Sequence, residues 1–206
     1  MNYKDFIGAK ATFSSHTWGE LTVESQSFTA AVDGDLVVSI GHPERVDAPL
    51  VRIHSECVFA EAFDSALCDC SDQLHMALSI IKKEGHGLLF YLRLDGRGVG
   101  LSAKVRATAL EVEGMDTYES RIHLNLSPEA RSFEVIGNYL SEHGFKRVRL
   151  LTNNPLKVEG LRHSGIVVDT LPLVVPSDNP HVHRLYETKA RRFGHEIPSS
   201  STHEQS

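Results

Sequence analysis

Short runs of alternating apolar and polar residues fill the N-terminal part of the chain, between residues 8 and 54. Examples are LTVESQSFTAAV and DLVVSIG. A period of two is typical of half-buried β-strands, and Gly34 and the Gly41-His42-Pro43 sequence mark turns between them. The pattern therefore predicts an antiparallel, β-rich N-terminal segment.

The period changes to that of a helix after Ser71. Leu74, Leu78 and Ile81 recur on one helical face. Ser71 is a candidate N-cap for this helix, and Gly85 is its stop. Three more segments have helical patterns: 101–114, 132–144 and 155–165. Three apolar runs between them are typical of buried strands: 87–93, 146–152 and 165–175. Strands that alternate with helices predict an α/β fold, with a mixed sheet layered with helices.

Length and composition fit a globular protein with 41% hydrophobic and 23% charged residues in a chain of 206. We expect a single domain over residues 1–195 and a disordered tail over 196–206, where EIPSSSTHEQS has little to bury. No apolar run approaches the ~20 residues of a membrane helix, and the N-terminus has no signal-peptide core. We therefore expect a cytoplasmic protein without membrane contact.

The net charge of −6 argues against a broad nucleic-acid surface, which requires a basic face. Basic islands nevertheless occur at 93–106 and 146–149. Islands of this kind beside glycine turns fit a small polyanion such as a nucleoside triphosphate. The alternative is that these charges occupy solvated faces of helices and strands.

All three cysteines, Cys57, Cys68 and Cys70, fall within one short segment. Three converging thiolates are what a catalytic zinc site needs, because the fourth tetrahedral position is then left to water. Free cysteines often merely pack, so the Cys-x-Cys pair alone is a weak signal. Cys57 and the polar residues around it strengthen the metal interpretation. An odd number of cysteines without a secretory signal also favours a reducing compartment over disulfides.

Two junctions between a strand and a helix carry groups suited to phosphate. Asp95-Gly96-Arg97-Gly98-Val99-Gly100 precedes the helix that starts at 101, and glycines there allow a close backbone approach to a ligand. An ordinary tight turn is the alternative. The second junction, LLTNNPLK, offers the Thr152 hydroxyl and the Lys157 ammonium, but it also fits an ordinary helix cap.

Together these elements resemble the GTP cyclohydrolase II family. The resemblance rests on an ordered set of motifs, namely VRIHSEC, CDC followed by Gln73, YLRLDGRGVGL, Asp116-Thr117 and RLLTNNPLKVEGL. It covers residues from about 49 to 195, through the closing ETKARRFGH, and more loosely the N-terminal strands. The combination is far more specific than any one piece.

The resemblance implies roles for individual residues. Cys57, Cys68 and Cys70 match the ligands of one zinc ion per chain. The residues that match nucleotide contacts are Arg52, Ile53, His54, Ser55, Glu56, Gln73, Asp95, Gly96, Arg97, Thr117, Thr152 and Lys157. Arg131 matches an arginine proposed to attack the α-phosphate, and Glu129 stands where the family has an aspartate as general base. A guanidinium is more often a charge clamp than a nucleophile.

One departure from the family concerns a tyrosine that the resemblance places near the metal. The family has a tyrosine in its K-[IL]-R-A-Y run, whereas this chain has Thr108 in KVRAT. Thr108 is shorter than a tyrosine and its hydroxyl is far less acidic than a phenol. The alternatives are that a neighbour such as Tyr91 or Tyr118 replaces the missing phenol, that the loop repacks, or that the chemistry near the metal has changed.

The sequence as a whole predicts a zinc-dependent enzyme that opens the guanine imidazole ring of GTP, or of a related purine nucleotide, and releases pyrophosphate. Zinc activates the water that attacks C8. Formate follows if deformylation is complete. The resemblance also implies a homodimer and Mg²⁺ bound with the triphosphate. The alternatives are a paralogue that stops at the formamidopyrimidine ribosyl phosphate, a non-catalytic nucleotide-binding domain, and a zinc-stabilised structural module.

Overall fold

The computed structural model describes residues 3–29 and 34–197 and contains one seven-stranded sheet, in the order β1-β2-β3-β5-β4-β6-β7. The strands are β1 (Lys10–Ser15), β2 (Gly19–Gln26), β3 (Asp35–Ile40), β4 (Leu50–Ser55), β5 (Gly87–Leu92), β6 (Arg147–Leu151) and β7 (Val167–Leu171). The predicted α/β fold with a mixed sheet is confirmed.

The sheet has an antiparallel half and a parallel half. β1, β2, β3 and β5 pair antiparallel, whereas β5, β4, β6 and β7 pair parallel. The expected antiparallel segment is therefore correct for β1 to β3 but wrong for β4. Five of the six residues of β4 are buried, among them the polar Arg52 and His54, so the strand is covered on both faces, as parallel strands are.

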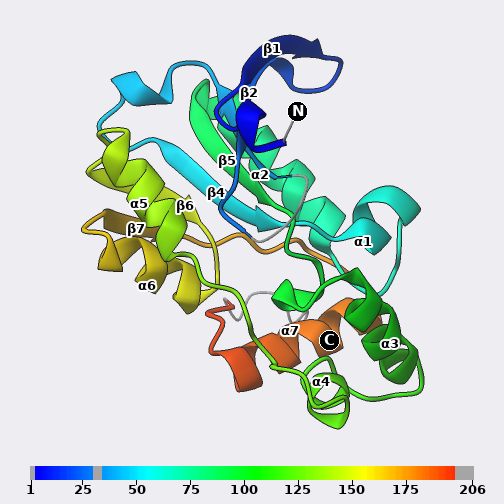
Figure 1. Ribbon diagram of the computed structural model, residues 1–206. Helices are drawn as coiled ribbons and strands as arrows, with labels where there is room; N and C mark the ends of the chain where they lie inside the picture. Colours follow the sequence, from blue (N-terminus) through cyan, green and yellow to red (C-terminus); the bar gives the residue numbers. More distant parts are fainter. Residues whose placement is uncertain (1–2, 30–33, 198–206) are drawn as a thin grey trace.

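Helices cover both faces of the sheet and one of its ends (Figure 1). The α-helices are α1 (Val58–Phe63), α2 (Cys70–Glu84), α3 (Leu101–Val112), α4 (Glu119–His123), α5 (Glu134–Glu142), α6 (Pro155–His163) and α7 (Pro180–Phe193). Short 3₁₀ turns lie at Tyr3–Phe6, Pro43–Arg45 and Asp95–Gly98.

Two hydrophobic clusters hold these layers together. The larger packs α5 and α6 against one face of the sheet, around Phe90, Ile136 and Leu161. The other packs α2 against the opposite face, around Ile81 and Leu50. Each of these five side chains is at most 1% exposed, so the sheet is fully covered where β4 and β5 run through its centre.

The carboxyl ends of the parallel strands β4, β5 and β6 lie at the end of the sheet where α3, α4 and α7 gather (Figure 1). Ligands of open α/β sheets bind outside this end of the strands. The segments that follow the three strands carry the VRIHSEC, glycine-turn and LLTNNPLK motifs. The topology therefore brings together motifs that lie about 100 residues apart in the chain.

Several sequence expectations for individual elements need correction. Helix α2 begins at Cys70 with Asp69 at the N-cap position, so Ser71 lies inside the helix and does not cap it. The last strand ends at Leu171, short of the expected residue 175, because Pro172 follows. The expected helices do not include α1, α4 and α7; the first two have only six and five residues. Of the expected tail, Glu196 and Ile197 are described, whereas 198–206 lie outside the described residues.

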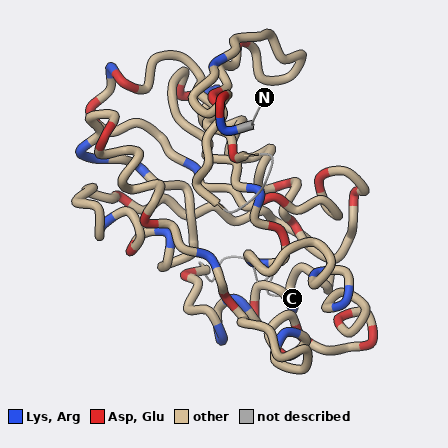
Figure 2. The backbone as a smooth tube through the Cα atoms, in the orientation of Figure 1, with Lys and Arg blue, Asp and Glu red and all other residues tan. Residues whose placement is uncertain are grey.

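Charges of both signs are interspersed along the whole backbone (Figure 2). In the described part of the chain, no helix has the length and apolarity needed to span a membrane.

Candidate active site

A cavity of about 200 Å³ opens at the carboxyl ends of the strands. It is lined from β4, α1, α2, the glycine turn, α3, α4, α6 and α7, together with the loops between them. Fifteen of the predicted site residues line it: Arg52, His54, Ser55, Glu56, Cys57, Cys68, Cys70, Gln73, Asp95, Gly96, Arg97, Thr108, Thr117, Arg131 and Lys157. The structure thus brings most of the predicted site into one place.

The three thiols converge at one end of this cavity. The sulfur atoms of Cys57, Cys68 and Cys70 all lie within 4.8 Å of one another, and those of Cys57 and Cys68 are 3.7 Å apart. Hydrogen bonds from the Cys68 and Cys70 thiols, and a weaker effect of Lys104, hold the pKa of Cys57 far below its ordinary value. The same coupling raises the pKa of Cys68 to about 11. The three thiols are therefore coupled in their protonation. Such coupling is expected of cysteines close enough together to bind one cation.

A hydrogen-bonded network lies directly behind Cys57. One carboxylate oxygen of Glu61 accepts from the Cys57 amide at 2.7 Å and lies 3.0 Å from Nε2 of His54. The other accepts from the Tyr91 hydroxyl at 2.6 Å. Burial raises the pKa of Glu61, but hydrogen bonds from His54 and Tyr91 outweigh it and keep the group ionised. Glu61 therefore fixes the turn that carries the first cysteine.

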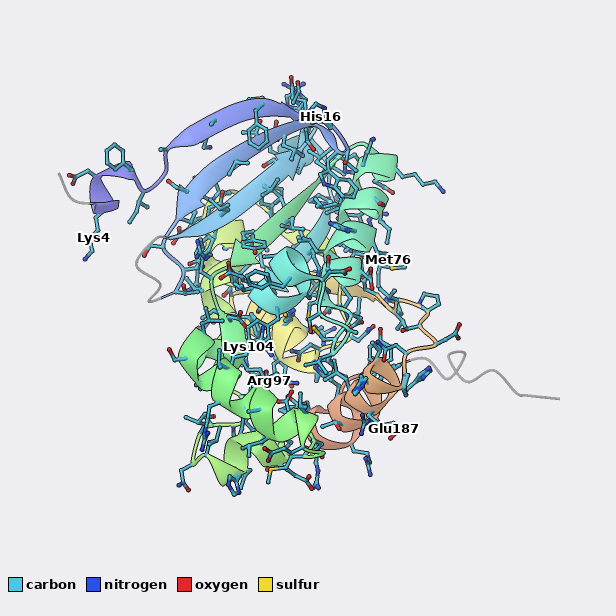
Figure 3. The ribbon with its side chains drawn as sticks, turned by 90° about the vertical axis from the view of Figure 1, so that its right-hand side faces the viewer. Lys4, His16, Met76, Arg97, Lys104 and Glu187 are labelled. Carbon is cyan, nitrogen blue, oxygen red and sulfur yellow. The ribbon has the colours of Figure 1, made fainter. Side chains whose placement is uncertain are left out.

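Lys104 links the thiols to the glycine turn. Its ammonium lies 3.0 Å from the Cys57 sulfur and 2.6 Å from a carboxylate oxygen of Asp95. Asp95 also accepts from the backbone amides of Gly96 at 2.6 Å and Val58 at 3.1 Å. Both oxygens of Asp95 are thus engaged by the protein itself. Figure 3 shows Lys104 and Arg97 near each other at the centre of the molecule, between the sheet and the lower helices.

The glycine turn has a left-handed backbone. Gly96, Arg97 and Gly98 have φ of 64°, 57° and 89°. A positive φ is unusual for arginine and costs energy, which is typical of functional sites. The turn directs the Arg97 guanidinium onto the ring of Phe193 in α7, 3.9 Å from its centroid. Burial and the nearby Arg131 lower the pKa of Arg97 to about 9.

Arg131 and Glu129 form a tight pair beside this turn. Glu129 accepts hydrogen bonds from Nε of Arg131 at 2.7 Å and from its backbone amide at 3.1 Å. A remaining guanidinium nitrogen of Arg131 donates to the Ser55 hydroxyl at 3.2 Å. Burial raises the pKa of Glu129, but the hydrogen bonds from Arg131 outweigh this effect, so the pKa lies below its ordinary value. Glu129 itself is not among the residues that line the cavity.

Two buried cations line the same cavity. Lys157 donates to the carbonyl of Ile53 at 2.8 Å, and burial moves its pKa well below the ordinary value. Arg52 donates to the Leu151 carbonyl at 2.9 Å and to Gln73 at 2.8 Å, and burial lowers its pKa to about 10. Neither cation forms an ion pair within the described residues. Because a buried charge is costly without a partner, this part of the cavity is suited to bind an anion.

A smaller chamber of about 40 Å³ continues from the main cavity and shares Arg52, Gln73, Lys157 and other residues with it. Thr152 lines only this chamber, and its hydroxyl accepts from the Asn154 amide at 3.1 Å. Asn154 caps α6 by accepting from Leu156 at 3.0 Å, so the segment is also a helix cap. The Ile53 side chain is fully buried in the core and reaches the site only through its carbonyl.

Thr108 lines the main cavity from α3, one helical turn after Lys104. The two tyrosines considered as replacements for the family phenol lie elsewhere. Tyr91 donates to Glu61, and Tyr118 packs edge-on against Phe193 at 5.8 Å. No tyrosine is found among the described residues that line the main cavity.

Sequence reasoning missed several lining residues: Phe59, Lys104, Glu111, Arg121, Asn154, Leu185, Lys189 and His195. Lys104 was visible only as part of a basic island. Arg121 is 4% exposed and lies on the short helix α4. Lys189 and His195 belong to the closing ETKARRFGH segment, whose sequence alone does not show that it folds back over the strand ends.

Comparison with known proteins agrees with this arrangement. The model of the GTP cyclohydrolase II family matches residues 7–172. The chain belongs to the GTP cyclohydrolase II family. A GTP cyclohydrolase-2 of Haemophilus influenzae is 44% identical over 160 residues, which cover 77% of this chain and 74% of that protein. One of Actinobacillus succinogenes is 45% identical over 159 residues, or 77% of this chain and 73% of that one.

A riboflavin biosynthesis protein of Vibrio vulnificus is 41% identical over 180 residues, which cover 86% of this chain and 48% of that longer protein. The family resemblance inferred from the motifs is confirmed, and the chain is an enzyme of the GTP cyclohydrolase II type. The match ends at residue 172, before α7 begins at Pro180.

Proposed function

We propose that this enzyme is a zinc-dependent hydrolase that opens the guanine imidazole ring of GTP and releases pyrophosphate, in the riboflavin pathway. One observation carries the proposal: a single cavity is lined both by three converging thiols and by several buried arginines and lysines. A guanine nucleotide needs both, since its ring is the site of hydrolysis and its triphosphate needs positive charge. The names of the relatives support the same substrate and pathway.

The thiol end fits zinc. Three sulfurs bound to a tetrahedral zinc at ~2.3 Å lie about 3.8 Å apart. Cys57 and Cys68 are 3.7 Å apart, and all three sulfurs are within 4.8 Å of one another. Three soft ligands favour zinc over hard cations and leave one position open. When bound, zinc supplies Lewis-acid activation of water at neutral pH.

The residues around the thiols orient the base. Cys57 is held through its amide by Glu61, while Lys104 and Asp95 fix the glycine turn against α1. The Asp95 carboxylate is occupied by donors of the protein itself. The turn therefore contacts the guanine ring through its backbone and the Arg97 side chain. Addition of water at C8 and cleavage of the ring C–N bond leave a formamide on the pyrimidine. A second water then releases formate.

The cationic end binds the phosphates. Arg131, gripped by Glu129 and donating to Ser55, presents a fixed positive charge. A guanidinium that is held by a carboxylate stabilises charge on phosphate better than it attacks phosphorus, so we assign Arg131 as a clamp. Water then attacks the α-phosphorus as pyrophosphate leaves. Lys157 and Arg52 supply further charge from below. Mg²⁺ enters with the triphosphate as part of the substrate.

A second outcome is favoured by Thr108. No phenol lines the described cavity, so ring opening without efficient deformylation would yield the formamidopyrimidine ribosyl phosphate. We also propose a cytoplasmic homodimer. Leu101 and Val105, on the outer face of α3, are 44% and 53% exposed and offer apolar surface to a second copy.

The decisive experiment is a mass spectrum of the products formed from GTP by protein loaded with one zinc per chain. Complete reaction, a formamide product and no turnover give three different masses. Metal analysis of the purified protein should find about one zinc per chain. Cys68→Ser should remove that zinc and ring opening together, whereas Asp64→Asn, at an exposed position in the same loop, should remove neither. Full activity of metal-free protein would refute the zinc mechanism.

A further inference from the structure

Helix α7 lies outside the segment that the family model matches, yet it forms one wall of the site. Leu185 and Lys189 of α7 line the main cavity, and so does His195, which follows the helix. Lys189 and His195 also line the smaller chamber that continues from it. Figure 1 shows α7 below the strand ends, beside α3 and α4.

Specific contacts hold α7 in this position. The Tyr186 hydroxyl donates to Asp69, the residue between two of the cysteines, and Lys189 lies 3.5 Å from the same carboxylate. The helix ends at Gly194 in the left-handed conformation, with φ of 64°. The next amide, of His195, donates to the Lys189 carbonyl at 3.1 Å. These bonds direct the His195 ring back toward the cavity.

The His195 imidazole is surrounded by positive charge and has an unused nitrogen. Its Nε2 is buried and has no hydrogen-bond partner in the described structure. Burial, and then the cations Lys189, Lys157, Arg97 and Arg131, lower the pKa of His195 to about 3, so the ring is neutral. Lysine and arginine side chains only donate hydrogen bonds. Nε2 receives no hydrogen bond from these side chains, so in the tautomer that carries the proton on Nε2 the ring has a free donor, and the acceptor that also balances the surrounding charge is an anion.

We propose that Lys189 and His195 form a wall of the polyphosphate subsite, with the Nε2–H of His195 donating to a phosphate oxygen and Lys189 supplying charge. The proposal rests on the proposed function for the identity of the polyphosphate as that of GTP. It adds α7 to a site whose other groups come from the segment that the family model matches.

The residues that line the smaller chamber include more cations than acids, which favours the binding of an anion there. Asp69 is the acid nearest to Lys189, but it is shared with Gln73 at 2.6 Å and with Tyr186. Lys157 and Arg52 have only carbonyl and amide acceptors within the described residues. Among the described residues, Asp69 is thus the one carboxylate that forms an ion pair with any of these three cations, and a bound phosphate group would supply further negative charge.

The test is calorimetric binding of inorganic tripolyphosphate and, separately, of guanosine to the zinc-loaded protein. His195→Phe keeps a planar ring but removes the donor, and Lys189→Met removes the charge. Each should weaken tripolyphosphate binding about 10-fold and leave guanosine binding unchanged. His195→Gln, which retains an amide donor, should recover part of the loss. The controls are His163→Phe and Arg191→Met, both exposed positions that should change nothing.

Unchanged tripolyphosphate binding in His195→Phe and Lys189→Met would overturn the proposal. An equal loss for guanosine would also overturn it, because the effect would then be structural. Absence of tripolyphosphate binding by the unaltered protein would do the same. If the unaltered protein binds tripolyphosphate through His195 but does not open the ring of GTP, the subsite stands and the proposed function fails.

Discussion

The two ends of the cavity are built in opposite ways. The thiol end comes from one short segment, Cys57 to Cys70, which includes the six-residue helix α1. The cationic end is assembled from residues far apart in the chain, on β4, the glycine turn, the loop before α5, α6 and α7: Arg52, Arg97, Arg131, Lys157 and Lys189. The thiol end depends on local folding, whereas the cationic end exists only when the whole sheet has formed.

The two ends also differ in how far their charges are compensated. The thiols can share protons among themselves, and Lys104 supplies a positive charge 3.0 Å from Cys57. At the other end, burial lowers the pKa values of Arg52 and Arg97 to about 10 and about 9. The protein thus holds cations out of water with few acids nearby, which costs stability until an anion binds. The difference supports the proposal that a metal binds to the thiols and that the substrate phosphates bind to the cations.

The largest effect expected at the cationic end concerns Arg131. Arg131→Ala should slow pyrophosphate release by about 10² to 10³, because a fixed charge on the phosphate is lost. Zinc content should stay at the unaltered level, since Arg131 does not contact the thiols. A pyrophosphate assay and metal analysis on the same preparation measure both.

Two further variants sharpen this result. Arg131→Lys should recover part of the rate if the side chain is a clamp and none if it is a nucleophile. Arg106→Ala, at an exposed position of α3, is the matched control and should leave the rate unchanged. Pyrophosphate release at the normal rate by Arg131→Ala would remove Arg131 from the site.

At the thiol end, Glu61→Gln should weaken zinc binding about 10-fold. Glutamine has one acceptor oxygen, so it cannot serve the Cys57 amide, His54 and Tyr91 together. Competition with a chromophoric chelator measures the affinity, and Glu113→Gln at an exposed position is the control. Tripolyphosphate binding should not change. A variant that lost phosphate binding but kept zinc would show that the two ends are not separate.

The same contrast explains what the sequence could predict. Three cysteines close together in the chain form a cluster that the sequence itself displays, and the fold brings their sulfur atoms within 4.8 Å of one another, as expected. Lys189 and His195 could not be found in this way, because their role depends on α7 folding back onto the strand ends. The parallel pairing of β4 was missed because alternation in a short strand resembles that of its antiparallel neighbours. Helices α2 and α6 were predicted to within a few residues.

The cationic end should also make the fold sensitive to acid. The pKa of His195 is about 3 in the folded protein against 6.5 ordinarily, so between these values the unfolded chain binds a proton that the folded chain does not. The free energy of unfolding therefore falls as the pH falls from about 6.5 to 3. In urea titrations at matched zinc loading, His195→Phe should reduce the slope of the free energy of unfolding against pH by the equivalent of up to one bound proton. His163→Phe should leave the slope unchanged. An equally steep dependence in His195→Phe would mean that burial and the nearby cations do not keep the ring neutral.

The smallest expected effect, a change in product ratio, concerns Thr108, which lies on the helix that runs past the thiol end. The unaltered protein should open the ring but release little formate, because a short hydroxyl cannot take the place of a phenol beside the reacting group. Thr108→Tyr should raise the ratio of formate to ring-opened product several-fold at unchanged zinc content. Thr108→Phe, which has the size but not the hydroxyl, should not. Stoichiometric formate from the unaltered protein would show that other groups complete the second hydrolysis, and that loss of the phenol has left the chemistry at the thiol end intact.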